Sequence, residues 1–572
     1  MRLLKISFFS ALLAVPAMAQ FTYPGCANLT AADFSMQELF NRSGSGGALT
    51  TNANLSEPVQ MDFRGIYNGA TLTAVDVYFV ERLGAVKYYN GTTHTVTLLG
   101  NIPIWGQSDN ALMGIAVDPN FTTTRLLYFW YSPPIPGNNG ALNRRLRLSR
   151  IPVSAGNTLT MASEQILIDI LGSKTDTWHS GGPMTFDSYG DLWLTIGNNS
   201  LDVESYAGSQ YSTTDSTASA EWGPSNTASM RGGILRIHPV ANLVNGKYYT
   251  IPAGNFAEYW ANQFQTQGNA ALATQYRNPA LVLPELYVKG SRSNFSVSVH
   301  PTRRWLAWAE VNYQSSSDEF NIADHPLFGG FPYFHSNNLN VPGNTKSIAA
   351  PTNTNPLNSG VNTLPPAIPG TINNLMNVAI SGPIYAFDRN NTAFGKFPPH
   401  LNNTWMLMGF SANQMYVTKV DSTAVTVSGT VNASTGIFNG VFTLRNPIQA
   451  KYGPDGALYI LNYSGFYSTT NPGLMRVEYV GNCTVTPIAK GRSTSVGYAI
   501  VMGLDGLKVN EPGKHEIGLY DLGGHKLFSQ QGRMGAEYSF AAMRKDSRLD
   551  KGVYVVRVKT ERGLYIRNLS LF

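Results

Sequence analysis

The sequence predicts an all-β protein built on a β-propeller and followed by a small β-sandwich. The composition is the first reason: 55 of the 572 residues are glycine, 32 are proline and only 13% are charged, which is typical of short strands joined by many turns. The second reason is a β-hairpin unit that recurs at irregular spacing, because repeated hairpins separated by long loops indicate a propeller with insertions.

Each copy of this unit has an alternating apolar strand, a turn with Asp, His or Gly-Pro, and a second strand rich in Leu, Trp and Tyr. Such alternation is the pattern of a strand with one buried face. The four copies cover residues 113–130, 184–195, 297–308 and 450–461. An earlier strand pair over 76–89 ends at the hairpin signal Asn90-Gly91.

Between these units, two insertions have their own character. Residues 256–273 are apolar with Ala and Gln, and are the best candidate for a helix. Residues 351–369 are rich in Asn and Pro, which predicts a long extended loop.

The two ends of the chain predict export and a second domain. Residues 1–19 hold Arg2 and Lys5, an apolar run and an Ala-x-Ala site, the pattern of a secretory signal. No later stretch is apolar and long enough for a transmembrane segment. We expect the propeller over 20–484, a linker over 485–497 and the β-sandwich over 498–572, where residues 552–558 alternate clearly. The protein is therefore expected to be secreted or at the cell surface, with the periplasm also open.

The charge of the chain is concentrated in its tail. From Lys490 onward there are 14 Lys and Arg against 8 Asp and Glu, although the whole chain has a net charge of only +6. No basic stripe interleaved with aromatic residues occurs in the propeller region, so the composition gives no reason to expect a nucleic-acid partner.

Two cysteines, Cys26 and Cys483, stand near the two ends of the predicted propeller. An exported protein can form disulfides, and a Cys26–Cys483 bond that ties the ends of this domain is the favoured interpretation. Neither cysteine has a histidine or second thiol at ligand spacing, which argues against a metal or catalytic role.

The main candidate for chemistry is His179, in Trp178-His-Ser-Gly-Gly182 before an alternating strand. An ordinary histidine has a pKa of about 6.5 and can accept a proton at neutral pH. The glycines Gly181 and Gly182 would let backbone or ligand approach the imidazole closely. On spacing alone, a structural histidine at a strand start is favoured.

The order of motifs, however, resembles the soluble glucose/sorbosone (aldose sugar) dehydrogenases, a quinoprotein family. The resemblance extends from about Cys26 to Cys483 and lies in residues 80–89, 112–121, 148–151, 179–182, 230–239, 284–287, 317–321, 329–333 and 452–459. It implies a six-bladed propeller, pyrroloquinoline quinone (PQQ) as hydride acceptor, and Ca²⁺ that holds this cofactor. It also favours catalysis over a structural role for His179.

The resemblance assigns roles to particular residues. His179 matches the base that takes the hydroxyl proton of the sugar, and Arg292 matches the arginine that faces the quinone oxygens and would stabilise their developing charge. Asp109 falls beside the cofactor. The backbone carbonyls of Asn312 and Tyr313 fall where the Ca²⁺ ligands lie, and carbonyl oxygen is a suitable ligand for that ion.

The sequence also departs from the family pattern. A lysine or arginine that pairs with the PQQ carboxylates would fall near residues 408–413, which contain no basic residue. Arg445, which resembles part of an Arg-Pro-Ile motif of close relatives, could partly compensate and is the third residue assigned to cofactor binding.

These observations leave two functions open. The first is an exported dehydrogenase that oxidises an aldose at the anomeric carbon to a lactone and passes electrons to an unidentified cytochrome or quinone. The second is a non-catalytic propeller that binds glycan or protein partners. The tail, over 519–526 and 549–558, resembles sorting or carbohydrate-associated sandwiches of secreted bacterial proteins, which implies an outer-membrane secretion machinery; a plain packing module is the equal alternative.

Overall fold

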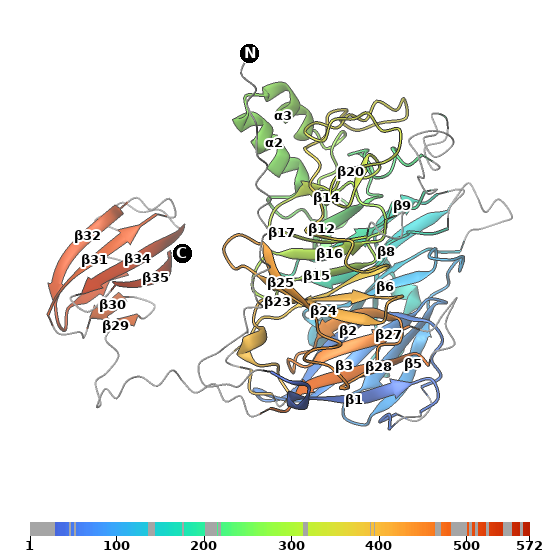
Figure 1. Cartoon of the computed structure of the whole chain (residues 1–572), viewed down its shortest axis with the longest axis horizontal. Helices are drawn as coiled ribbons and strands as arrows, with labels where there is room; N and C mark the ends of the chain where they lie inside the picture. The colour runs from blue at the N-terminus through green and yellow to red at the C-terminus, as the bar shows by residue number, and fades with distance from the viewer. Residues whose placement is uncertain are drawn as a thin grey trace, which may run out of the picture. The chain divides into compact units, whose positions relative to one another are not determined.

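The computed structural model forms two compact units, Met1–Thr484 and Val485–Phe572, and is nearly all β as predicted (Figure 1). Within the described part of the chain, no helix has the length and apolar character needed to cross a bilayer. The described residues are 29–44, 47–50, 53–134, 144–173, 177–200, 214, 219–312, 318–388, 391–393, 395–463, 471–481, 500–502, 506–509, 513–521, 526–540, 552–560 and 564–571. The predicted signal peptide lies outside them.

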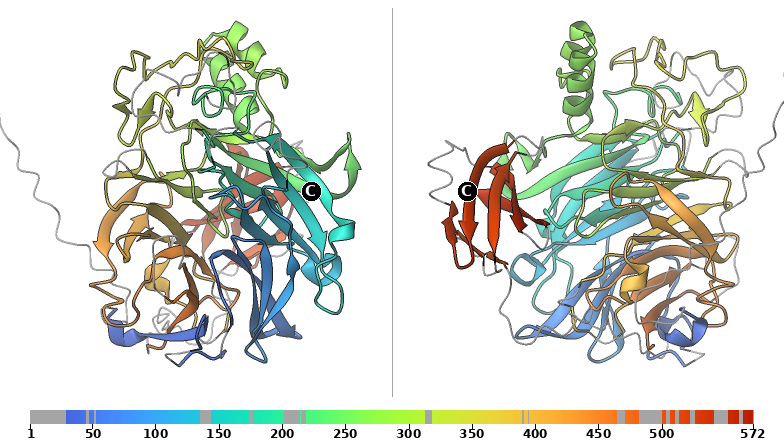
Figure 2. Two further views of the ribbon diagram at one scale, coloured as in Figure 1. Left: turned by 90° about the vertical axis from the view of Figure 1, so that its right-hand side faces the viewer. Right: turned by 60° about the vertical axis from the view of Figure 1, so that its left-hand side comes forward.

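Among the described residues of the first unit, the inner strands of successive sheets contact one another in a closed ring (Figures 1 and 2). In ring order they are β2 (Pro58–Asn68), β6 (Leu112–Val117), β10 (Met184–Phe186), β15 (Ser296–Val299), β22 (Ala379–Ile384) and β26 (Pro447–Tyr452), which contacts β2 again. Sheets arranged around one axis make a β-propeller, so the predicted fold class is confirmed.

Four of these sheets have four antiparallel strands, and in three of them the strands follow one another along the chain, whereas β18 to β20 lie between β17 and β21 in the fourth. Their sheet orders are β2-β3-β4-β5, β6-β7-β8-β9, β15-β16-β17-β21 and β22-β23-β24-β25. The strands not yet given are β3 (Thr71–Glu81), β4 (Ala85–Asn90), β5 (Thr95–Asn101), β7 (Leu126–Tyr131), β8 (Arg145–Pro152), β9 (Gln165–Leu171), β16 (Leu306–Glu310), β17 (Glu319–Ala323), β21 (Ile372–Asn373), β23 (Thr404–Gly409), β24 (Gln414–Val420) and β25 (Val427–Asn432). The short helix α1 (Phe121–Thr124) joins β6 to β7.

The sheet that begins with β10 carries the insertion with the predicted helix. It comprises β10, β11 (Leu192–Ile196), β12 (Gly233–Val244), β13 (Lys247–Thr250), β14 (Leu286–Lys289) and β18 (Leu327–Phe328), and the hairpin β19 (Phe334–His335) and β20 (Leu339–Asn340) follows. The predicted helix is present, but as two, α2 (Phe256–Thr266) and α3 (Ala270–Tyr276). The break falls at Gly268, which has a φ of 80°, and at Asn269, whose side chain caps α3 through the amide of Leu272. The predicted extended loop at 351–369 has no helix or strand of its own.

The last sheet joins the two ends of the propeller. Its order is β1 (Phe34–Asn41), β28 (Gly473–Tyr479), β27 (Leu458–Asn462) and β26, so the first strand of the chain completes the sheet formed by the last ones. The β1–β28 pairing is antiparallel and supplies backbone hydrogen bonds that hold the ring closed. Cys26 and Cys483 lie outside the described residues, and their disulfide stays a prediction.

The hairpin units share one contact that explains their common sequence pattern. In three of them an aspartate of the turn accepts a hydrogen bond from an aromatic side chain of the next strand: Asp118 from Tyr128 at 3.2 Å, Asp187 from Trp193 at 3.0 Å and Asp455 from Tyr459 at 3.0 Å. The aspartate fixes the turn while it satisfies the polar tip of a buried aromatic ring. These contacts account for the aspartate in the turn of the repeated unit.

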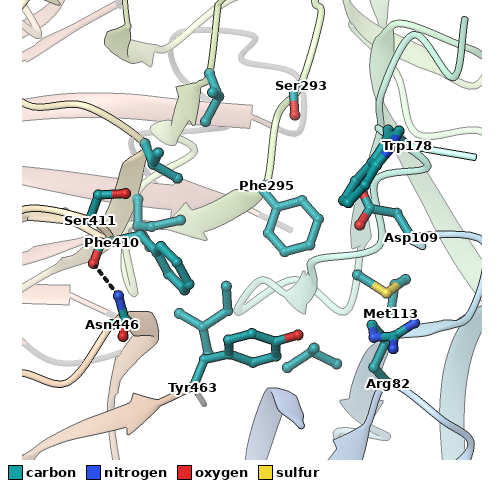
Figure 3. Close-up of a pocket in the computed structure, with 15 residues that line it drawn as sticks. Arg82, Asp109, Met113, Trp178, Ser293, Phe295, Phe410, Ser411, Asn446 and Tyr463 are labelled. Atoms are coloured by element: carbon teal, nitrogen blue, oxygen red, sulfur yellow. Dashed lines mark hydrogen bonds between the residues drawn. The ribbon is translucent and has the colours of Figure 1, made fainter. Parts of the chain in front are cut away.

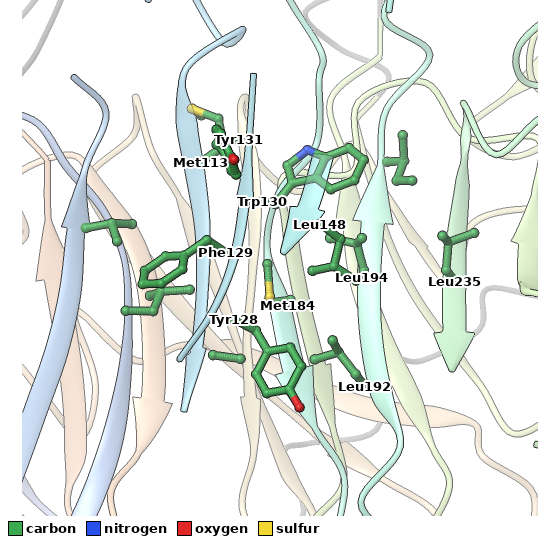
Figure 4. Close-up of a cluster of buried hydrophobic side chains, with 14 of the residues drawn as sticks. Met113, Tyr128, Phe129, Trp130, Tyr131, Leu148, Met184, Leu192, Leu194 and Leu235 are labelled. Atoms are coloured by element: carbon green, nitrogen blue, oxygen red, sulfur yellow. The ribbon is translucent and has the colours of Figure 1, made fainter. Parts of the chain in front are cut away.

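Large apolar side chains fill the space between neighbouring sheets. Figure 4 shows side chains of β6, β7, β10 and β11 packed together, among them Trp130, Met184 and Leu194, each with no exposed surface. The Trp130 indole also donates a hydrogen bond of 3.1 Å to the carbonyl of Ser180. The core therefore holds the segment next to His179 in place.

The second unit contains two sheets, β29-β30-β33 and β32-β31-β34-β35. Their strands are β29 (Ile500–Met502), β30 (Gly506–Val509), β31 (Lys514–Tyr520), β32 (Lys526–Arg533), β33 (Glu537–Ser539), β34 (Gly552–Thr560) and β35 (Leu564–Leu571). Both sheets contribute to one apolar cluster that includes Leu507, Ile517 and Val556. The sorting role expected for this unit stays a prediction.

Candidate active site

His179 lies in the segment that leads into β10, in the left-handed backbone conformation with a φ of 57°. Its backbone N–H donates to Asp109 Oδ2 at 2.8 Å, and its Nδ1 lies 3.1 Å from Asn198 Oδ1. The Asn198 amide oxygen can accept a hydrogen bond from a protonated Nδ1, the tautomer whose lone pair lies on Nε2. The half-buried imidazole is thus oriented as a base.

Two buried cations hold Asn198 in position. Arg231 donates from Nε to the carbonyl of Asn198 at 2.9 Å and from Nη2 to that of Asn199 at 2.7 Å. Lys289 donates in turn to the carbonyl of Arg231 at 2.6 Å, and to those of Gly223 and Ser229. Burial lowers the pKa of Lys289 well below its ordinary value. The cations thus fix the loop that carries the partner of His179.

The glycines beside His179 bring backbone segments together. A Cβ at Gly181 would lie 2.4 Å from the carbonyl oxygen of Thr195, and one at Gly182 would lie 2.5 Å from Cβ of Met113. Both residues also have a positive φ. The predicted close approach is therefore present, but the neighbours are strands β11 and β6.

Asp109 joins two parts of this site. Besides the amide of His179, its backbone carbonyl accepts a hydrogen bond from the Ser180 hydroxyl, and its own amide donates to Thr177 at 3.0 Å. The structure thus brings the predicted residues Asp109 and His179 into direct contact.

Arg292 lies on the other side of Asn198. Its carbonyl accepts from the Asn198 amide at 2.7 Å, and its buried guanidinium donates from Nη1 to the carbonyl of Val311 at 2.6 Å. The Arg292 amide donates to Glu310 Oε2 at 3.0 Å. Arg292 and His179 are therefore linked through one residue, Asn198.

Three buried carboxyl groups lie behind Arg292. Glu310 and Glu319 face each other across β16 and β17, and burial raises the pKa of both, with the charge of Glu310 raising that of Glu319 further. Burial also raises the pKa of Asp318 to about 6, although backbone amides and Arg292 oppose the rise. Burial therefore disfavours the charged form of all three carboxyl groups.

The predicted calcium ligands are described only in part. Asn312 is buried, and its amide donates to Asp318 Oδ1 at 3.0 Å. Tyr313 lies outside the described residues. No group of three or more His, Cys, Asp or Glu side chains suited to a metal occurs in the described part of the chain. The predicted ligands are backbone carbonyls, so the calcium site stays a prediction.

Arg445 is engaged away from His179. Its guanidinium makes a two-point ion pair with Glu38 of β1, with Nη1 3.2 Å from Oε2. Arg445 therefore reinforces the sheet that closes the ring. Its predicted role in cofactor binding stays a prediction.

A cavity of about 580 Å³ lies beside these residues (Figure 3). We call it the central pocket because its lining comes from all six sheets of the ring, close to where the inner strands begin. The lining residues are Val59, Arg82, Asp109, Met113, Trp178, Ser293, Phe295, Val311, Val378, Ile380, Phe410, Ser411, Asn446, Ile448 and Tyr463. His179 and Arg292 are not in the lining, but Trp178, Asp109 and Ser293 beside them are.

Sequence reasoning missed Asn198, Arg231 and Lys289. Asn198 carried a local signal in the sequence, because it follows an apolar strand and a glycine, Gly197. In the structure, a Cβ at Gly197 would lie only 2.2 Å from the carbonyl oxygen of His179. The roles of Arg231 and Lys289 could not be predicted, because their side chains donate to backbone carbonyls, which no residue type marks in the sequence.

Comparison with known proteins identifies the part of the chain that contains Asp109 and His179. Residues 57–245 match the family model of the glucose / sorbosone dehydrogenases. The predicted resemblance to this family is confirmed over these residues. Arg292, Asn312 and Arg445 follow the matched segment.

Solved structures resemble a larger part of this chain in fold. A glucose dehydrogenase is 14% identical over 77% of this chain and 98% of its own, with a TM-score of 0.50. The soluble aldose sugar dehydrogenase of Escherichia coli, in its apo form, is 15% identical over 78% and 99%, with a TM-score of 0.49. A PQQ-bound aldose sugar dehydrogenase from Streptomyces coelicolor is 15% identical over 74% and 100%, with a TM-score of 0.44. At such identities the first likeness supports the fold alone.

Proposed function

We propose that this protein is an exported oxidoreductase that oxidises an aldose at its anomeric carbon to a lactone. The observation that carries the proposal is the oriented imidazole of His179 beside the central pocket, in contact with Asp109 and Asn198. Oxidation of a hemiacetal requires removal of the hydroxyl proton while hydride leaves carbon. The imidazole of His179 would take that proton, and its contact with Asn198 Oδ1 at 3.1 Å orients the ring.

The family suggests PQQ as the cofactor, with Ca²⁺ at the carbonyls of Asn312 and Tyr313. PQQ, when bound, supplies a quinone that accepts hydride. The aromatic side chains Phe295, Phe410 and Tyr463 suit its fused rings. Its three carboxylates, however, find one basic side chain in the described lining, Arg82, which already pairs with Glu57 at 2.7 Å. The lining matches the rings and not the carboxylates, so PQQ is proposed on family grounds.

The test is sugar oxidation by purified protein supplied with PQQ and Ca²⁺. We expect dye reduction with at least one aldose, and a loss of turnover of about 10²- to 10⁴-fold in His179→Ala. The variant should keep the wild-type affinity for PQQ, measured by titration, because the imidazole acts on the sugar proton. His238→Ala is the matched control. This partly exposed histidine lies on β12 and pairs with Asp191, which precedes β11. Equal turnover in wild type and His179→Ala would contradict the proposal.

A second candidate is a non-catalytic propeller that binds glycan or protein. The lack of an uncommitted cation in the described pocket lining favours it. No uptake of PQQ and no activity on a broad panel of sugars would support this alternative.

We also propose export through the segment 1–19, with the second unit as a sorting module at the cell surface. Expression of the full chain and of residues 1–484, followed by fractionation, tests this. Identical distribution of the two forms would contradict a sorting role.

A further inference from the structure

We infer that the central pocket selects a neutral quinone without carboxylates. This inference rests on the proposed function, because that function requires a hydride acceptor. The chemical class of the acceptor follows from the lining of the pocket. A cavity of about 580 Å³ is in the size range of sites for small organic ligands.

The described walls of the pocket are mostly apolar. Aliphatic and aromatic side chains face it from different sheets, among them Val59, Phe295, Val378, Ile380, Phe410 and Ile448. In Figure 3 the ring of Phe295 points into the centre, facing the rings of Phe410 and Tyr463. The centroids of the Phe410 and Tyr463 rings lie 5.8 Å apart. Such walls favour a flat apolar ring system, because burial of its faces removes apolar surface from water.

The charges of the described lining oppose a polyanionic ligand. The Arg82 guanidinium is committed to Glu57 and to the carbonyl of Ser108 at 2.8 Å. Asp109 contributes a carboxylate. Burial raises the pKa of Tyr463, so its phenol is neutral. A ligand carboxylate here would lose its hydration without gaining a free cation, whereas a neutral carbonyl would not incur that cost.

The few polar groups of the lining suit a neutral carbonyl. Ser293 and Ser411 place hydroxyl groups at the pocket (Figure 3), and a hydroxyl can donate a hydrogen bond to a quinone oxygen. Asn446 donates its side-chain amide to the Phe410 carbonyl at 3.1 Å, which fixes the segment that carries the Phe410 ring.

The reaction with such an acceptor balances. The C1–H bond of the sugar breaks, and its electron pair moves with the hydrogen to the quinone. The hydroxyl proton goes to His179, and the C–O bond becomes the carbonyl of the lactone. The reduced quinone takes up one proton and leaves as the hydroquinone, two electrons and two protons richer.

The first test measures binding without sugar, by isothermal titration calorimetry of the full chain. The probes are menadione, a neutral bicyclic quinone, and PQQ with Ca²⁺. We expect saturable binding of menadione that is tighter than that of PQQ. Phe295→Ala should weaken menadione by about tenfold, whereas Leu243→Ala, at an exposed site on β12, should leave it unchanged. Ile448→Lys should shift the preference toward PQQ by adding a cation.

The outcomes separate this inference from the proposed function. Tighter binding of PQQ, or menadione binding that is insensitive to both Phe295→Ala and Ile448→Lys, would overturn the inference whatever the activity. Saturable binding of menadione that follows the variants would support it. If no sugar is then oxidised with either quinone, the proposed function fails while the pocket's selectivity stands.

Discussion

The surroundings of His179 and the central pocket lie next to each other and are built on opposite principles. Around His179, polar groups are held by hydrogen bonds: Asp109 accepts from the His179 amide, Asn198 contacts the His179 ring, and Arg231 donates to the Asn198 carbonyl. The pocket is lined by apolar side chains that impose shape more than charge. A polar network fixes one geometry because each broken bond is costly in a dry environment, whereas an apolar wall tolerates change. The reacting end of the site is therefore specified more tightly than the ligand-binding end.

The largest effect on the polar network around His179 is expected from Arg231→Met. Methionine keeps much of the volume but leaves the buried carbonyls of Asn198 and Asn199 without their donors. The free energy of unfolding should fall by about 2–5 kcal/mol. Urea denaturation measures this loss.

The same variant separates positioning from mere stability. If Arg231 positions the partner of His179, kcat should fall more than KM changes in protein that is still folded. Arg277→Met is the control, because this arginine is exposed and its guanidinium donates to the side chain of Asn262 at 3.3 Å. An unchanged kcat in folded Arg231→Met would show that the loop does not need this support.

A smaller effect is expected from Asp318→Asn, behind Arg292. Burial raises the pKa of Asp318 to about 6 from 3.8, so the folded state holds its proton more tightly than the unfolded state. The stability due to this group is present below pH 3.8 and is lost as the pH rises through about 6. Wild type should lose roughly 3 kcal/mol over that window.

Asparagine cannot ionise, so the variant should show a flatter dependence of unfolding free energy on pH. Urea denaturation across this window compares the two proteins, and only the difference in slope matters. Parallel curves for wild type and Asp318→Asn would mean that the carboxyl is already ionised in the folded state throughout.

The sequence predicted the parts of the fold that depend on local pattern. Alternation and the turn aspartates gave the hairpins, because Asp187 acts on residues close to it in the chain. The role of Arg445 could not be read in this way: its partner Glu38 is 407 residues away, on the strand that closes the ring. The pocket could not be predicted from the sequence either, because its lining residues come from six different sheets.

The smallest effect is expected from a change at the contact between Asn198 and His179. Asn198→Asp would put a carboxylate beside Nδ1 in a site without exposed surface. A neighbouring anion stabilises the imidazolium, so the acidic limb of kcat/KM should move upward by about 1 pH unit. Asn199→Asp is the matched control, because Asn199 is equally buried but its side chain bonds to Ser173 and Trp178. A limb that moves in the control and not in Asn198→Asp would assign the base to another residue, and the polar network would then serve the fold alone.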